Sequence, residues 1–93
     1  MASGTQKKIV VIESGAVSTG ELQPNTGSDV NVPINIPQNM TILMASVSEN
    51  TGANLFPVWI YRIDKTNNYV IVKCMNSRTT AYTGSISVTV LCE

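Results

Sequence analysis

β-Branched residues recur at alternate positions through most of this chain, and this pattern restricts the fold more than any other feature. Valine and isoleucine together supply 20 of the 93 residues, whereas leucine supplies only 4. These stiff side chains suit a pleated strand better than a helix. No run of helical length shows apolar residues at the 3.6-residue period. The sequence therefore predicts an all-β protein, and its length fits one domain.

Six or seven strands are predicted. The clearest is at residues 29–36 (DVNVPINI), where four apolar residues alternate with polar residues and Pro33. Because Pro33 cannot donate a ladder hydrogen bond, we expect this strand at a sheet edge or unpaired at that residue. The other strand runs are residues 7–13, 41–48, 54–63, 69–75 and 85–92, with a weak run within 16–22. This number of short strands fits a small antiparallel β-sandwich.

Three polar segments are predicted to join these strands as loops. Residues 14–29 contain three of the six glycines, and we expect a long excursion there. Residues 64–68 (DKTNN) lie between two strand runs and predict a β-hairpin. Residues 76–84 form a polar loop in which Tyr82 is the one aromatic residue.

Residues 54–63 (NLFPVWIYRI) are the most hydrophobic and aromatic run in the chain. Its two alternating sets are Leu55, Pro57, Trp59, Tyr61 and Ile63 against Phe56, Val58, Ile60 and Arg62. Neither set is polar enough to be freely solvated. We therefore expect one set in the core and the other against a second sheet or a neighbouring subunit. Trp59 and Tyr61 are expected in the core or at a subunit interface.

The charge balance and the missing histidine exclude several functions. Six basic and six acidic residues cancel, so no sustained field favours nucleic acid or an anionic membrane. The absence of histidine excludes His-based triads and His-bound zinc. No glycine-rich nucleotide motif or acidic metal loop occurs. We expect no enzyme activity, no cofactor, no metal site, no nucleic-acid partner and no membrane insertion.

Cys74 and Cys92 are the only cysteines, and both lie inside strand runs. Two ligands this far apart do not form a metal site by themselves. A disulfide between neighbouring strands and two buried free thiols are both compatible with this placement.

Arg78, Thr80 and Tyr82 form the candidate ligand site. They stand together in the polar loop at 76–84, where they offer one ring face, one cation and hydroxyl groups. Such a set suits a small polar ligand, including the apolar face of a sugar. The alternative is an ordinary surface loop.

Four segments, ESGAVSTGEL, DVNVPINIPQNMTILMASVSE, NYVIVKCM and SISVTVLCE, follow one another from Glu13 onward. In this order they resemble the small β-sandwich of H-type lectins and the related tips of bacteriophage tail fibres. The resemblance implies a homotrimer, or a dimer of trimers, that binds cell-surface carbohydrate at surfaces shared between subunits.

On this resemblance we expect a receptor-binding tip of a phage tail fibre or baseplate that recognises a bacterial surface glycan. We expect it in the virion, after synthesis in the host cytoplasm without a signal peptide, and with residues 1–6 as a flexible tail. Two alternatives stay open: a structural virion decoration or assembly protein without a ligand, and a free bacterial lectin or adhesin module.

Overall fold

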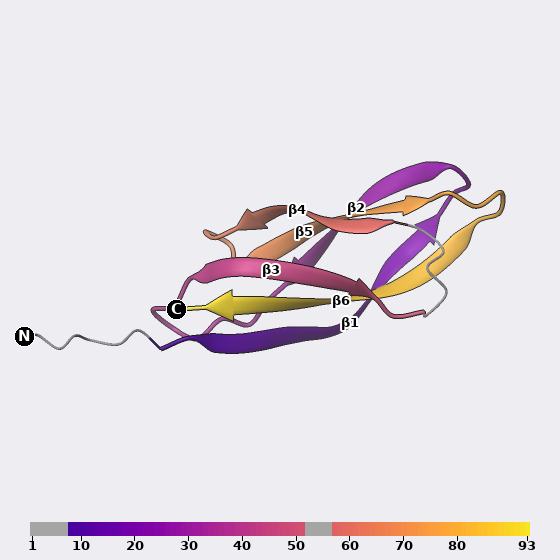
Figure 1. Cartoon of the computed structure of the whole chain (residues 1–93). Helices are drawn as coiled ribbons and strands as arrows, with labels where there is room; N and C mark the ends of the chain where they lie inside the picture. Colours follow the sequence, from indigo (N-terminus) through magenta and orange to yellow (C-terminus); the bar gives the residue numbers. More distant parts are fainter. Residues whose placement is uncertain (1–7, 52–56) are drawn as a thin grey trace, which may run out of the picture.

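A computed structural model describes residues 8–51 and 57–93, and this part of the chain is all-β (Figure 1). The strands are β1 (Val10–Leu22), β2 (Thr26–Pro33), β3 (Ile42–Glu49), β4 (Val58–Asp64), β5 (Tyr69–Asn76) and β6 (Tyr82–Cys92). They form two three-stranded antiparallel sheets, ordered β1-β6-β3 and β2-β5-β4. No helix that could cross a membrane occurs in residues 8–51 and 57–93. The prediction of an antiparallel all-β fold with six strands is confirmed.

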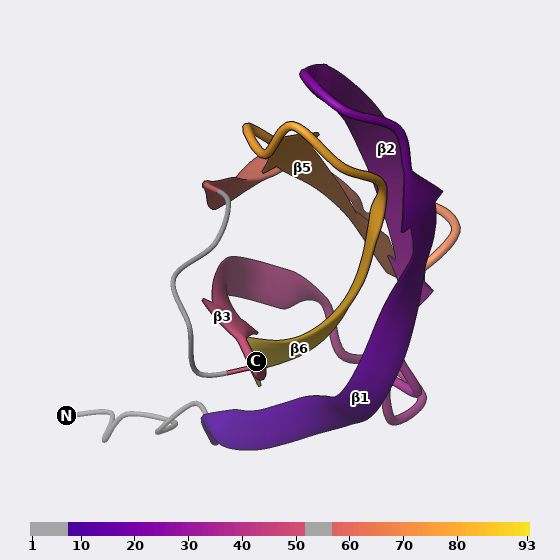
Figure 2. The ribbon, with the colours of Figure 1, turned by 90° about the vertical axis from the view of Figure 1, so that its right-hand side faces the viewer.

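The two sheets curve around one shared core, as the end-on view shows (Figure 2). The central strands β5 and β6 supply much of it, since every second residue is fully buried. These residues are Val70, Val72 and Cys74 on β5, and Ile86, Val88, Val90 and Cys92 on β6. The alternation seen in residues 85–92 therefore predicted the inward face of β6 correctly.

The long loop predicted for residues 14–29 is wrong. β1 continues to Leu22, and residues 23–25 turn the chain directly into β2. Gly15 and Gly20 have positive φ angles of 77° and 71°, and each lies at a shift in the β1–β6 register. A glycine in this conformation makes a bulge within a strand as readily as a turn between strands. Both glycines therefore bend β1 without ending it.

Two hydroxyl groups replace ladder hydrogen bonds at these bulges. The Ser14 hydroxyl accepts from the Val88 N–H at 3.0 Å, and the Thr19 hydroxyl accepts from the Gly84 N–H at 2.9 Å. Buried backbone donors in β6 thus keep partners where β1 bulges.

Pro33 ends β2, which lies at an edge of its sheet, so the expected edge position is confirmed. The strand starts earlier than predicted, at Thr26, and stops before Ile34. The inward alternation nevertheless holds, because Val30, Val32 and Ile34 are buried.

The predicted β4–β5 hairpin is confirmed and is closed by Asp64. Its carboxylate accepts from the Asn67 N–H at 2.9 Å, the Thr66 N–H at 3.0 Å and the Asn67 side-chain amide at 3.1 Å. The hydrogen bond from the Asn67 backbone, with smaller contributions from the others, lowers the pKa of Asp64. Residues 54–56 of the predicted strand, and the predicted tail at 1–6, lie outside the described residues.

Both cysteines are free, buried thiols on opposite sheets, Cys74 on β5 and Cys92 on β6. Burial, helped by the negative charge of Asp29, raises the pKa of Cys74 to about 11. Burial also raises the pKa of Cys92. Of the two arrangements compatible with the sequence, the structure has the buried thiols.

These thiols are expected to be inert in the folded protein. With a pKa near 11, about 0.1 % of Cys74 is thiolate at pH 8, and the core blocks access to it. A colorimetric thiol reagent at pH 8 should label almost none of the native protein and two thiols per chain in denaturant. Rapid labelling of the native protein at the rate of a free peptide thiol would contradict the buried positions.

Candidate ligand-binding face

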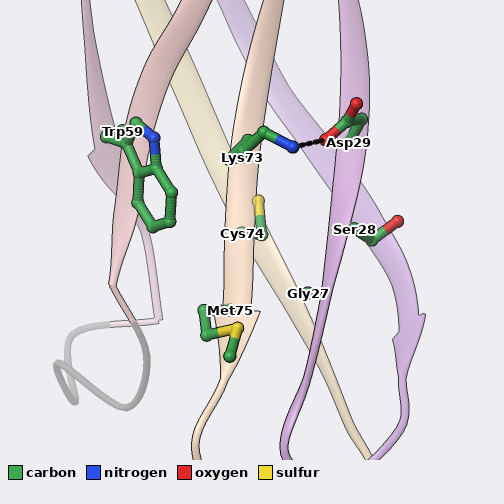
Figure 3. A pocket seen from close by; sticks show the side chains of 7 residues that line it. All are labelled: Gly27, Ser28, Asp29, Trp59, Lys73, Cys74 and Met75. Atoms are coloured by element: carbon green, nitrogen blue, oxygen red, sulfur yellow. Dashed lines mark hydrogen bonds and ion pairs between the residues drawn. The ribbon is translucent and has the colours of Figure 1, made fainter.

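The outer face of the β2-β5-β4 sheet combines aromatic and charged side chains. Asp29 on β2 pairs with Lys73 on β5, and Lys73 pairs in turn with Trp59 on β4. The three residues therefore form a row across the sheet (Figure 3). The Trp59 side chain is 45 % exposed, which is unusual for a residue of this size in the middle of a strand.

Tyr61 lies on the same face as Trp59, which is two residues before it, and β4 carries an extra residue at this point. Ile60 pairs with Val72 and Arg62 pairs with Ile71, so Tyr61 has no partner of its own on β5. Such a bulge redirects side chains locally. Tyr61 is 56 % exposed, and its ring centroid lies 4.5 Å from the Lys73 ammonium group, a cation–π contact.

Lys73 connects the two sides of this face. Its ammonium group donates to Asp29 Oδ1 at 2.9 Å. This hydrogen bond, assisted by the charge of the same carboxylate, raises the pKa of Lys73. The lysine is therefore a cation at neutral pH, held between a carboxylate and a ring.

A surface hollow of about 510 Å³ lies beside these residues. Its lining consists of Gly27, Ser28, Asp29, Trp59, Lys73, Cys74 and Met75. Figure 3 shows Trp59 on one side and the β2 residues on the other, with β5 as the floor. A Cβ atom at Gly27 would lie 3.1 Å from Met75 Sδ, so a side chain there would crowd the methionine. The volume is in the usual range for small-molecule sites.

Taken together, an exposed indole, a phenol, a cation and a carboxylate suit a ligand with both an apolar and a hydroxylated side. The ring faces offer stacking, and Lys73, Asp29 and the Ser28 hydroxyl offer hydrogen-bond donors and acceptors. We refer to Asp29, Trp59, Tyr61 and Lys73 as the aromatic face.

The prediction that Trp59 and Tyr61 lie in the core is wrong, since both are on the outer face. Their position at a subunit interface stays a prediction. The sequence contained one usable signal for Lys73: it is the one charged residue within the apolar run of β5 and must therefore face outward.

The predicted ligand site is a short, ordered turn. The loop between β5 and β6 comprises only residues 77–81, because Tyr82 begins β6 and packs partly against the core. The Arg78 guanidinium carbon lies 4.8 Å from the Tyr82 ring centroid, and Thr80 is exposed. Arg78, Thr80 and Tyr82 are thus close together, but one ring face of Tyr82 is already in contact with Arg78. The hollow of about 510 Å³ does not include them.

Asn76 organises this turn and was not singled out from the sequence. Its fully buried side-chain amide donates to the carbonyl oxygens of Leu22 at 2.9 Å, Thr80 at 3.0 Å and Gln23 at 3.3 Å. Its side-chain oxygen accepts from the Arg78 N–H at 2.9 Å. One residue therefore fixes the end of β1 and the β5–β6 turn together.

Within residues 8–51 and 57–93, no group of three or more cysteine, aspartate or glutamate side chains is arranged to hold a metal ion. Comparison with known proteins gave no match: no family model, curated protein or solved structure is significantly similar to this chain. The fold and the aromatic face thus define a β-sandwich with a polar and aromatic surface on one sheet.

Proposed function

We propose that this chain is a carbohydrate-binding β-sandwich that serves as the receptor-binding tip of a phage tail fibre or baseplate. Its ligand is a bacterial surface glycan, bound on the aromatic face. The observation that carries the proposal is the half-exposed Trp59 beside the hydrogen-bonded Lys73–Asp29 pair, above a hollow of about 510 Å³.

The chemistry of this face favours a sugar over other small ligands. A pyranose ring presents C–H groups on one side, which stack on an indole, and hydroxyl groups around its rim, which both donate and accept. The paired Lys73 and Asp29 offer one donor group and one acceptor group at fixed positions. With a net charge of zero, the chain has no field that would favour a polyanion.

The affinity of such a site is low, and assembly into a homotrimer compensates for it. A shallow face binds a monosaccharide with a dissociation constant of roughly millimolar to micromolar. Three rigidly held sites that reach one glycan-covered surface gain about 10² to 10⁴ in avidity.

Substitution of Trp59 by alanine tests the proposal. Glycans bound by the wild-type protein are identified on an array and titrated by calorimetry. We expect Trp59→Ala to weaken binding about fivefold, as stacking on an aromatic ring contributes about 1 kcal/mol. Trp59→Phe should retain most of the affinity. Leu43→Ala, at an exposed apolar residue of the opposite sheet, is the matched control.

If Trp59→Ala left glycan binding unchanged and Arg78→Ala or Tyr82→Ala abolished it, the glycan site would be assigned to the β5–β6 turn. If no glycan or host cell is bound at all, the chain is a structural virion module. The exposed apolar residues of the β1-β6-β3 sheet favour that second function, because they suit assembly contacts.

A further inference from the structure

The first half of β1 lies at an open edge of its sheet. The structure assigns this edge to pairing with a second copy of this chain. Within the described residues β1 pairs only with β6, so its other edge has no strand partner. An unpaired edge exposes backbone donors and acceptors that another strand can use.

The backbone groups that face this edge follow from the hydrogen bonds of β6. Thr41 and Glu93 exchange backbone hydrogen bonds of 2.9 and 3.0 Å, so the groups of Glu93 point toward β3. Successive residues of a strand point to opposite edges, so Cys92 and Val90 point toward β1. Their partners Val10 and Ile12 then point toward β6. Ile9, Val11 and Glu13 consequently direct their N–H and C=O groups to the open edge.

Within residues 8–51 and 57–93, each other edge strand carries a proline or a bulge, whereas the first half of β1 carries neither. β2 carries Pro33, and the registers of β3 and β4 shift at Leu43 and Tyr61. Prolines and bulges are common devices against pairing with another chain. The bulges of β1 begin only after Glu13. The segment at residues 9–13 has neither device.

The side chains beside the open edge are apolar. Ile9 is 51 % exposed and Val11 is 60 % exposed, and both lie on the outer face of the β1-β6-β3 sheet. Val11 pairs with Leu91, which pairs with the 57 % exposed Met44. Leu91 and Met44 line a second hollow of about 240 Å³. The open edge therefore continues into an apolar patch.

Antiparallel pairing of two copies about a two-fold axis at Val11 satisfies both the backbone and the side chains. It sets Val11 opposite its own copy and Ile9 opposite Glu13, so all three outward-pointing residues are paired. All of them lie on the same face of the combined six-stranded sheet. If the two-fold axis passed through Val10 instead, Glu13 would lie opposite residue 7 of the other copy, which is outside the described residues.

Charge supports the same arrangement. Lys8 precedes the apolar run and Glu13 ends it, and both are exposed. Pairing about Val11 places Glu13 of each copy beside Ile9 of the other, one residue from Lys8. Lys8 of one copy then lies opposite Ser14 of the other, on the other face of the sheet from Glu13. Each end of the paired strands therefore holds one positive and one negative group, and no two like charges lie opposite each other. A parallel partner would place like charges side by side.

Sedimentation equilibrium of the full chain, at concentrations up to about 100 μM, tests this pairing. The expected wild-type mass is an even multiple of the 10.0 kDa chain, either a pair of chains or a pair of the trimers of the proposed function. Val11→Lys puts two ammonium groups on the axis and should halve that mass or weaken association about fivefold. Val11→Thr, which keeps a β-branched residue, is the matched control.

Reversal of the charges provides a second readout. Glu13→Lys alone should weaken association, and the double variant Lys8→Glu/Glu13→Lys should restore it. All these positions are exposed, and thermal unfolding by circular dichroism reports whether each variant folds.

A single-chain mass at about 100 μM, or a mass that Val11→Lys leaves unchanged, would overturn the edge pairing. A three-chain assembly insensitive to Val11→Lys would also overturn it, but would agree with the trimer of the proposed function. Glycan binding that Trp59→Ala leaves unchanged, in a protein whose pairing is intact, would overturn the aromatic face as the glycan site and leave the edge pairing standing.

Discussion

Replacement of Asn76 by alanine is expected to lower the free energy of unfolding by about 3 to 4 kcal/mol. The side chain is fully buried and takes part in four hydrogen bonds, three to carbonyl oxygens and one from the Arg78 N–H. Each such bond contributes about 1 kcal/mol, and the substitution leaves buried backbone groups without partners. Urea denaturation followed by circular dichroism measures the change.

Asn50→Ala is the matched control. The Asn50 amide donates to the hydroxyls of Ser85 at 3.2 Å and Ser87 at 2.7 Å, but the site is exposed and water replaces these bonds. We expect a loss of less than about 1 kcal/mol. Equal effects of the two substitutions would show that the Asn76 amide does not connect β1 to the β5–β6 turn in solution.

Ile86→Ala is expected to cost about 3 to 4 kcal/mol. Ile86 is fully buried in the middle of the core, between the two sheets, and its truncation leaves a cavity. A domain of this size has a total stability of about 5 to 14 kcal/mol, so much of it would be lost. The melting temperature should fall by roughly 4 to 8 °C per kcal/mol.

A graded pair of substitutions controls this measurement. Ile86→Val removes one methylene and should cost about 1 kcal/mol, whereas Leu43→Ala on the outer face should cost less than about 0.5 kcal/mol. If Ile86→Ala were no more destabilising than Leu43→Ala, the assignment of β6 to the centre of the core would be wrong.

Alternation was a reliable guide wherever one face of a strand is polar. In β6, serines and threonines alternate with Ile86, Val88 and Val90, and the structure buries the apolar set. In β4 both alternating sets are apolar, so the sequence did not determine which one faces the core. The core was consequently one of the two environments predicted for Trp59 and Tyr61, and the aromatic face was missed.

Glycine and asparagine were harder to interpret because each serves two structural purposes. Gly15 and Gly20 have the same chemistry in a bulge as in a turn, and only their pairing with β6 shows that β1 continues. Asn76 has the composition of a loop residue, yet its amide is buried because it meets carbonyl groups from β1. Such a contact joins residues 54 positions apart, which no local pattern reveals.

The extra residue in β4 adds to the outer surface of the sheet without changing its inward face. Without Tyr61, the remaining sequence of β4 would still alternate regularly, with Ile60 and Ile63 inward and Trp59 and Arg62 outward. The inward set of β4 thus does not depend on this tyrosine. Deletion of Tyr61 would keep Ile60 and Ile63 in the core and remove only a phenol beside the indole, so the solvent-facing surface can change at this position while the core stays the same.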